Sequence, residues 1–357
     1  METITIDWHG RETHLLLNPR MPLGERERLE GVVRDLPQLE GHVWIATSGT
    51  SGAIKLAALS KTALLASAAA VNRHLEATAG DVWCCVLPAF HVGGLGIQAR
   101  AELSASRVVA FDWDAQRFAQ ERDVTLASLV PAQVRDLVVA GLRAPNAMRA
   151  IVVGGGAMAP DLYESARGLG WPVLPSYGLT EGCSQVATAS GNSPVLRLLS
   201  HVEAKIEGGL IALRSPSLLT GYGLIGPLGG AEFVDPKRDG WLITEDRGRV
   251  EGGVLEVFGR SGEFVKIGGE SVDLLRLDGI LDSVRGQLDA ALVPVPDERL
   301  GSVIHLAARA EAGAVVEDFN RRVLPFERIR AVHRVEAIPR TELGKLQRRL
   351  LIETLLA

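Results

Sequence analysis

The pattern of hydrophobic and polar positions alternates between two periods from about residue 42 to residue 175. Short runs of β-branched and other apolar residues predict strands at 42–47, 82–87, 107–111, 125–130, 150–153 and 172–174. Between them, helical spacing predicts helices over 62–75, after an N-cap at Ser60, and over 132–142, after Pro131. Asp114 is expected to cap a further helix. This alternation predicts a mostly parallel sheet with helices on its faces.

The pattern changes after Gly191, where short strands and glycine turns predict a β-rich subdomain with strands at 202–206, 210–214 and 254–258. The last hundred residues show a smaller α+β pattern, with strands at 264–267, 290–295 and 303–308 and helices at 274–284, 315–323 and 346–355. A chain of 357 residues exceeds the size of one core. We therefore expect an α/β protein with a large N-terminal domain, residues 1–259, and a small α+β C-terminal domain, residues 260–357.

Composition and charge narrow the class of protein. Hydrophobic residues make up 46% and charged residues 23% of the chain, and the net charge is −5, so neither nucleic acid nor an anionic membrane is an expected partner. The apolar stretch at 62–71 is too short to span a bilayer. Cys84, Cys85 and Cys183 do not form a disulfide framework, and the N-terminus lacks a signal-peptide pattern. A cytoplasmic protein is expected.

Two glycine-rich segments follow predicted strands. The first has small hydroxyl residues and glycines that leave backbone N–H groups free for a phosphate, and it comprises Thr47, Ser48, Gly49, Thr50, Ser51 and Gly52, with Lys55 just beyond. It lacks the Gly-Lys-Ser/Thr ending of a Walker A loop. The second comprises Gly154, Gly155, Gly156 and Ala157, at the edge where open α/β sheets bind ligands. Taken alone, the first segment is better explained as a plain flexible loop and the second as a tight turn before a helix.

Three further segments carry polar groups of defined chemistry. Ser176, Tyr177 and Gly178 lead to Thr180 and Glu181, which offer a flat ring, a hydroxyl and a hard oxygen ligand for Mg²⁺. Asp246 offers a carboxylate to a ribose, and Arg260 follows one strand later. Lys345 ends the run Pro-Arg-Thr-Glu-Leu-Gly-Lys at 339–345. By themselves these segments also fit solvated loops and a surface lysine.

The five segments, in this order, resemble the acyl-adenylate-forming superfamily of acyl-CoA synthetases, adenylation domains and luciferases. The resemblance covers about residues 42–347 and implies an enzyme that uses ATP and Mg²⁺ to adenylate a small-molecule carboxylic acid and then transfers the acyl group to CoA. It implies these roles: residues 48–55 hold the β- and γ-phosphates, Gly154–Ala157 and Tyr177 frame the adenine, Thr180 contacts the α-phosphate, Glu181 binds Mg²⁺, Asp246 and Arg260 bind the ribose, and Lys345 lies between the α-phosphate and the acid.

The chain departs from the family pattern at three places. Ile54 replaces the usual proline before the loop lysine, and Gly262 stands at the hinge position about which the small domain of the family rotates. Only about 46 residues precede the phosphate loop, whereas family members carry a long N-terminal region. The resemblance still implies a mobile C-terminal domain, and it allows a homodimer.

Within the superfamily, the chain most resembles the o-succinylbenzoate–CoA ligases of menaquinone biosynthesis. The similarity lies in the run Leu-Pro-Ala-Phe-His-Val-Gly-Gly-Leu at 87–95 and in residues 176–185. We hypothesise that His91, Gly94 and Ser184 approach the acid, and that Arg100 or His201 meets its second carboxylate. Two alternatives remain, a CoA ligase for another aryl or short-chain acid and a degenerate ATP- or AMP-binding protein without ligase activity.

Overall fold

The computed structural model describes residues 6–36, 39–48, 54–191, 193–226, 230–260, 264–267, 270–297, 300–342 and 344–356. The chain forms two compact units, the first comprising residues 1–158, 162–244 and 249–256, and the second residues 159–161, 245–248 and 257–357. The domain boundary between residues 259 and 260 stays a prediction. Among the helices of the described ranges, none combines the length and hydrophobicity that crossing a bilayer requires.

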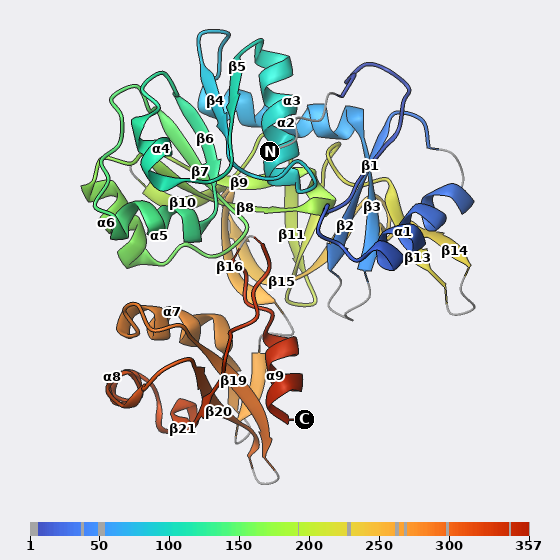
Figure 1. Cartoon of the computed structure of the whole chain (residues 1–357). Helices are drawn as coiled ribbons and strands as arrows, with labels where there is room; N and C mark the ends of the chain where they lie inside the picture. Colours follow the sequence, from blue (N-terminus) through green and yellow to red (C-terminus); the bar gives the residue numbers. More distant parts are fainter. Residues whose placement is uncertain are drawn as a thin grey trace. The chain divides into compact units, whose positions relative to one another are not determined.

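One large sheet of eleven strands runs through the described chain (Figure 1). Across the sheet, the strands are β11 (Glu203–Glu207), β12 (Leu210–Arg214), β15 (Leu242–Glu251), β16 (Val254–Arg260), β10 (Ser193–Leu198), β9 (Ser184–Ser190), β8 (Val173–Leu179), β7 (Ala150–Val153), β6 (Leu126–Leu129), β4 (Val82–Cys85) and β5 (Arg107–Ala110). Strands β8, β7, β6, β4 and β5 are parallel, whereas β9 and β10 pair antiparallel with their neighbours. The expected α/β class is confirmed, and strands from the β-rich segment extend the same sheet.

Helices cover both faces of the parallel part of this sheet (Figure 1). They are α2 (Lys61–Leu75), α3 (Val92–Ser104), α4 (Ala115–Gln120), α5 (Pro131–Val139) and α6 (Pro160–Gly168). The chain moves outward from β4 to β5 and then back through β6, β7 and β8, so right-handed crossovers place α3 on one face and α4, α5 and α6 on the other. Every residue of β4, β6 and β7 is buried, as expected for parallel strands covered on both faces.

A second sheet of the first unit contains β1 (His14–Leu16), β2 (His42–Ser48), β3 (Ile54–Ser60), β13 (Gly221–Ile225) and β14 (Ala231–Val234). Strands β2 and β3 pair antiparallel along their whole length. The connection between them is too short for the crossover that a parallel pair needs. Strand β2 therefore belongs to this second sheet and not to the eleven-stranded sheet. Helix α1 (Leu23–Asp35) packs against this sheet through Leu29 and Val32, which contact a core that includes Trp44.

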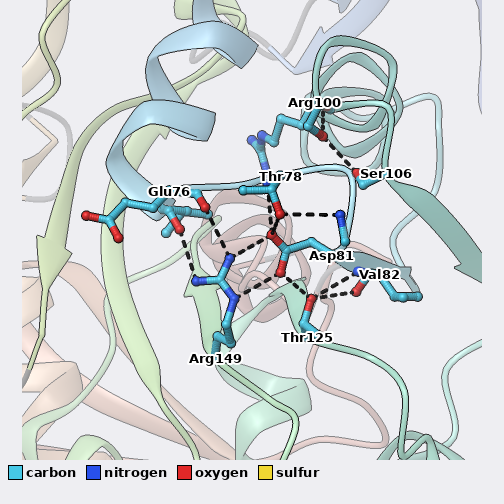
Figure 2. A network of polar contacts seen from close by, with 11 residues as sticks. Glu76, Thr78, Asp81, Val82, Arg100, Ser106, Thr125 and Arg149 are labelled. Carbon is cyan, nitrogen blue, oxygen red and sulfur yellow. Dashed lines mark hydrogen bonds and ion pairs between the residues drawn. The ribbon is translucent and has the colours of Figure 1, made fainter.

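A network of polar contacts joins the N-terminal ends of three parallel strands (Figure 2). The carboxylate of Asp81, just before β4, accepts hydrogen bonds from Thr125 Oγ1 at 2.7 Å and from Arg149 Nε and Nη2 at 2.9 and 2.8 Å. The backbone N–H of Thr78 donates to the same carboxylate at 2.9 Å, and Arg149 also donates to the Leu75 carbonyl at the end of α2 at 3.3 Å. Asp81 is 5% exposed, so the network fixes a buried charge.

Replacing Arg149 by methionine is expected to lower the free energy of unfolding of the first unit by about 2 kcal/mol, because a buried carboxylate loses its cation while Arg149 itself is partly exposed. Burial alone would raise the pKa of Asp81, but hydrogen bonds from Arg149, Thr125 and Thr78 outweigh burial and lower that pKa from 3.8 to about 2. The ionised Asp81 carboxylate therefore adds to the free energy of unfolding above pH 3.8, and this stabilisation is lost only as the pH falls towards 2.

The loss caused by Arg149→Met is thus expected to be equal at pH 5 and pH 8. Urea unfolding followed by tryptophan fluorescence measures it, since all six tryptophans lie in the first unit. The matched control is Arg11→Met, which removes an exposed ion pair with Glu40 and should cost no more than about 0.5 kcal/mol. Equal effects of the two substitutions, or a marked pH dependence of the difference, would contradict this account.

The second unit has its own core around a three-stranded sheet. Its elements are β17 (Phe264–Ile267), β18 (Glu270–Asp273), α7 (Leu274–Val284), β19 (Ala290–Asp297), β20 (Gly301–Ala308), α8 (Gly313–Arg321), β21 (Ile329–Arg334) and α9 (Arg348–Leu356). Side chains of β19 alternate between two cores, with Leu292 in a cluster that contains residues of α7 and α8 and Val293 in a cluster that contains Leu351 of α9. The α+β pattern expected for the C-terminal part is confirmed.

Candidate active site

The glycine segment after β7 lies at the C-terminal edge of the parallel strands. Val153 pairs with Pro175 of β8, so the residues that follow the two strands are neighbours. Ser176 Oγ donates to the Val153 carbonyl at 3.0 Å, and a Cβ atom on Gly154 would lie 3.0 Å from that hydroxyl oxygen. Gly155 turns the chain with a φ of +78°. The structure thus brings Ser176 to the start of the segment Gly154–Ala157, most of which is exposed.

The run Ser176–Leu179, expected as a loop, is the second half of strand β8. It pairs antiparallel with β9, with a register shift between Tyr177 and Gly178. A Cβ atom on Gly178 would lie 2.2 Å from the carbonyl oxygen of Ser184, so only glycine fits this crossing. Cys183 and Ser184 have φ angles of 59° and 150°. The bulge and these two residues form a tight turn that fixes the 3₁₀ helix η1 (Thr180–Gly182) at the end of the strand.

The expected phosphate loop joins the ends of β2 and β3. Thr47 pairs with Lys55, and Thr47 Oγ1 donates to the Lys55 carbonyl at 3.4 Å. The predicted phosphate-binding residues between the strands lie outside the described residues: Gly49, Thr50, Ser51 and Gly52. The backbone of Ser48 ends β2, and Lys55 is the second residue of β3. The hairpin therefore places the lysine beside the base of the loop.

Glu181 and Lys55 meet around a residue that the sequence analysis did not single out, Tyr222 of β13. The Tyr222 hydroxyl donates to Glu181 Oε1 at 2.5 Å, and Lys55 Nζ lies 5.3 Å from the centre of the Tyr222 ring. The Glu181 carbonyl accepts from the Leu219 N–H at 2.7 Å. Three segments distant in sequence therefore place a cation, a phenol and a carboxylate side by side in the first unit.

This arrangement fits a magnesium ion held together with phosphates. Within the described parts of the chain, no group of three or more His, Cys, Asp or Glu residues is placed to bind a metal. Mg²⁺ typically takes one or two protein carboxylates and completes its shell with phosphate oxygens and water. Among the described residues, a hydrogen bond is made to Oε1 of Glu181 only, so Oε2 remains available. Glu181 is thus suited to bind Mg²⁺ together with the phosphates of ATP.

Arg100 of α3 is buried among hydroxyl groups rather than carboxylates. Its side chain is 1% exposed, Nη1 donates to Ser128 Oγ at 3.1 Å, and Nη2 donates to Ser184 Oγ at 2.9 Å. Burial lowers the pKa of Arg100 to about 10, so it stays charged at neutral pH. The ion pairs of the described ranges do not include Arg100, its Nε makes no hydrogen bond there, and its guanidinium carbon lies 5.4 Å from the centre of the Trp83 ring. A buried cation without a counter-ion is costly, so the site is suited to an anionic ligand.

Two glycines of α3 have different surroundings. A Cβ atom on Gly94 would lie 2.3 Å from the carbonyl oxygens of Leu87 and Pro88, so this glycine lets the helix approach the preceding backbone closely. A Cβ atom on Gly96 would lie 3.1 Å from Arg100 Nη2 and 3.4 Å from Ser184 Oγ. Gly96, rather than Gly94, therefore keeps space open beside the guanidinium.

The two histidines named in the sequence analysis differ in what they offer. His91 is the residue before α3, and its ring contacts that of Phe90, with centroids 4.7 Å apart. The ring nitrogens of His201 make no hydrogen bond within the described chain. Burial, and to a lesser extent the charge of Arg73, lower the pKa of His201 to about 4. His201 is neutral at pH 7, so of the two residues proposed to meet a second carboxylate only Arg100 supplies a positive charge.

The three remaining candidates, Asp246, Arg260 and Lys345, all belong to the second unit. Asp246 is a half-buried residue of β15, and Arg260 is the last residue of β16, with its side chain outside the described set. Lys345 is exposed and lies in a turn in which its N–H donates to Thr341 Oγ1 at 3.1 Å and its carbonyl accepts from the Thr341 N–H at 2.8 Å. Gly344 adopts a φ of +76°, which allows the turn to present Lys345.

The structure adds Ser128, Gly96 and Tyr222 to the candidates. Gly96 precedes Arg100 by four residues on α3, so both lie on one face of a helix that the sequence analysis did not predict. Ser128 stands within an apolar strand, where a buried hydroxyl needs a partner. No local signal pointed to Tyr222, because its contact with Glu181 spans 41 residues.

Comparisons of the sequence and of the structure with known proteins both find AMP-binding enzymes and acid–CoA ligases. A family model described as "AMP-binding enzyme" matches residues 35–222. The chain is 27% identical over 330 residues to a 2-succinylbenzoate–CoA ligase of Enterococcus faecalis, covering 84% of this chain and 67% of that protein. It is 31% identical over 338 residues to an indoleacetate–CoA ligase of Aromatoleum aromaticum, covering 85% and 65%. The structure of o-succinylbenzoate CoA synthetase from Bacillus subtilis, in complex with the acyl-adenylate intermediate, superposes with a TM-score of 0.77 at 26% identity, covering 87% of this chain and 68% of that one.

Proposed function

Because the chain belongs to the family of AMP-binding enzymes, we propose that it is an ATP-dependent acid–CoA ligase that acts through an acyl-adenylate. Its proposed substrate is o-succinylbenzoate, which is converted to o-succinylbenzoyl-CoA with release of AMP and pyrophosphate. The similarity to 2-succinylbenzoate–CoA ligases supports this substrate. The structural observation that carries the proposal is Arg100, a buried cation without a described carboxylate partner.

The first proposed step joins the acid to AMP. An oxygen of the acid's carboxylate attacks the α-phosphorus of ATP, and the bond to pyrophosphate breaks. Both reactants are anions, so the reaction needs positive charge and hydrogen-bond donors where negative charge accumulates. In the proposal, Lys55 and residues 47–52 bind the β- and γ-phosphates, Thr180 donates to the α-phosphate, and Lys345 neutralises the charge that develops there. Mg²⁺, held by Glu181, would further neutralise the phosphates.

The nucleoside and thiol parts of the reaction complete the proposal. Gly154–Ala157, Ser176, Tyr177 and Gly178 frame the adenine, and Asp246 and Arg260 bind the ribose. In the second step, a CoA thiolate attacks the acyl carbon and AMP leaves with the bonding electrons, which yields the thioester. Gly262, the proposed hinge for the small domain, lies outside the described residues.

The dicarboxylate nature of the substrate explains the surroundings of Arg100. One carboxylate of o-succinylbenzoate is activated, and the carboxylate on its ring stays charged throughout the reaction. A buried guanidinium flanked by two serine hydroxyls suits that second anion, because a planar donor pair matches a carboxylate. His91, Gly94 and Ser184 complete the proposed acid site.

A panel of acids in an ATP–pyrophosphate exchange assay without CoA tests the function and the substrate together. The informative pair is o-succinylbenzoate and 3-benzoylpropionate, which has the same keto-acid chain but no carboxylate on the ring. Exchange is expected with o-succinylbenzoate at a kcat/KM at least about a hundredfold higher, the worth of a charged bidentate contact. Equal use of both acids would exclude the role given to Arg100.

A second candidate function is ligation of an aryl acid that has no second carboxylate. The similarity to indoleacetate–CoA ligase favours it, and exchange with indoleacetate but not with o-succinylbenzoate would establish it. If no acid supports ATP–pyrophosphate exchange although the chain binds ATP, the chain is a nucleotide-binding protein without ligase activity. We also propose a cytoplasmic location, because the three cysteines do not form a disulfide framework and fit a reducing compartment. The proposed homodimer rests on the family resemblance alone.

A further inference from the structure

Tyr222 is held rigidly because its strand is pressed against a core. On β13, Tyr222 alternates with Gly221 and Gly223, which face the opposite side of the sheet. A Cβ atom on Gly221 would lie 2.5 Å from the Phe233 ring, and one on Gly223 would lie 2.9 Å from Leu36 and 3.1 Å from Trp44. Glycine at both positions lets β13 approach these side chains closely. The backbone that carries Tyr222 therefore has little freedom to move away from Glu181.

The segment before β13 also restrains Glu181, through a hydrogen bond to its main chain. The Leu219 N–H donates to the Glu181 carbonyl at 2.7 Å, and the Thr220 N–H donates to the Ala58 carbonyl of β3 at 2.8 Å. Lys237 Nζ donates to the Leu219 and Thr220 carbonyls at 2.7 and 3.1 Å. The main chain of Glu181 is thus bonded to Leu219, and its carboxylate is bonded to Tyr222.

We infer that Tyr222 is a positioning residue for the Mg²⁺-binding carboxylate of Glu181 and that it couples this carboxylate to Lys55 of the phosphate-loop hairpin; this inference rests on the proposed function. The hydroxyl donates to Oε1, so Oε2 would be the oxygen left to hold the cation. The face of the ring attracts the Lys55 ammonium, which is 5.3 Å from its centre. One phenol therefore sets the positions of the carboxylate that meets Mg²⁺ and of the lysine that meets the phosphates.

A structural role alone explains this geometry less well. A half-buried carboxylate that served only stability would be expected to pair with a cation, and Lys55 instead lies over the ring. A neutral donor keeps the negative charge of Glu181 available for a metal ion while still fixing its rotamer. Outer partners of metal-binding side chains commonly act in this way.

Calorimetric titration of the full chain with ATP, with and without Mg²⁺ and without acid, tests the inference. Tyr222→Phe keeps the ring beneath Lys55 and removes only the hydroxyl. It is expected to reduce the gain in ATP affinity that Mg²⁺ provides by roughly tenfold, and to leave ATP binding without Mg²⁺ unchanged. In a Glu181→Gln background the same substitution should have no further effect on the Mg²⁺ gain, because Tyr222 acts through Glu181.

Tyr163→Phe is the matched control. Tyr163 is a buried tyrosine of α6 whose hydroxyl makes no hydrogen bond in the described structure, so its loss should leave the Mg²⁺ gain as it is in the wild type. A Mg²⁺ gain in Tyr222→Phe equal to that of the wild type would overturn the inference, as would an equal loss in the Glu181→Gln background. Failure of the wild-type chain to bind ATP at all would overturn the proposed function and this inference with it.

Discussion

Replacing Lys345 by alanine is expected to reduce acid-dependent ATP–pyrophosphate exchange at least about a hundredfold, the usual cost of removing a group that stabilises developing charge. Thioester formation from supplied acyl-AMP and CoA should persist at nearly the wild-type rate. The difference arises because negative charge accumulates at the α-phosphate only while the adenylate forms. The second step expels AMP and needs no cation at that place. Comparison of the two half-reactions on one enzyme preparation measures the effect.

Lys345→Ala should remove only the side chain, because the backbone hydrogen bonds of the turn that carries Lys345 stay in place. The hydrogen bonds between residues 341 and 345 use the main chain of Lys345 and the Thr341 hydroxyl. Lys205→Ala is the control, since it removes another exposed lysine that pairs with Glu207. Exchange should be retained in the control. Equal loss of both half-reactions in Lys345→Ala would show that the residue supports the fold or both steps, not adenylation alone.

Where apolar periodicity and end signals agree, the sequence predicted the elements closely. The strand Ala150–Val153 and the helix Leu274–Val284 have the predicted bounds. Ser60 and Asp114 accept the hydrogen bonds expected of N-cap residues, from Ala63 and Arg117. These elements depend on burial of an apolar run and on a local side-chain cap, and both are visible in the sequence.

Elements that depend on distant partners were not predicted. Helix α3 has glycine at positions 93, 94 and 96, which weakens intrinsic helix propensity, yet it forms because Gly94 lets it pack on the backbone of residues 87–88. The second half of β8 reads as a loop because it contains Pro175, Ser176 and Gly178, and its pairing with β9 supplies the stabilisation. Local propensity was outweighed by tertiary packing in both cases.

In the candidate site too, features carried by local motifs were predicted and features that depend on distant partners were not. The order of its motifs along the chain identified the chemistry, and the structure brings Glu181 and Lys55 around one ring and Ser176 to Gly154. The donors that surround them come from segments with no motif, such as Ser128 and Tyr222. Such partners depend on which strands become neighbours in space, and that information does not reside in any short stretch of sequence.

Replacing Arg100 by methionine is expected to raise the KM for o-succinylbenzoate by at least about a hundredfold, while use of 3-benzoylpropionate stays unchanged or improves. Methionine fills a similar volume without charge, so the ring carboxylate loses its counter-ion and an uncharged ring gains an apolar contact. Binding of Mg·ATP should be unaffected. Steady-state exchange kinetics with the two acids, measured on wild type and variant, give the comparison directly.

Stability separates this role from a structural one. Arg100 is a fully buried cation with two neutral hydrogen-bond partners and no described counter-anion, so its removal is expected to leave the free energy of unfolding unchanged or slightly increased. Arg100→Lys keeps a charge but loses the planar donor pair, and it should recover only part of the affinity for o-succinylbenzoate. A large loss of stability in Arg100→Met, with equal loss of activity towards both acids, would instead assign Arg100 to the core that joins α3, β6 and β9. Selective loss of the dicarboxylate with the fold intact is the result that a substrate-binding guanidinium requires.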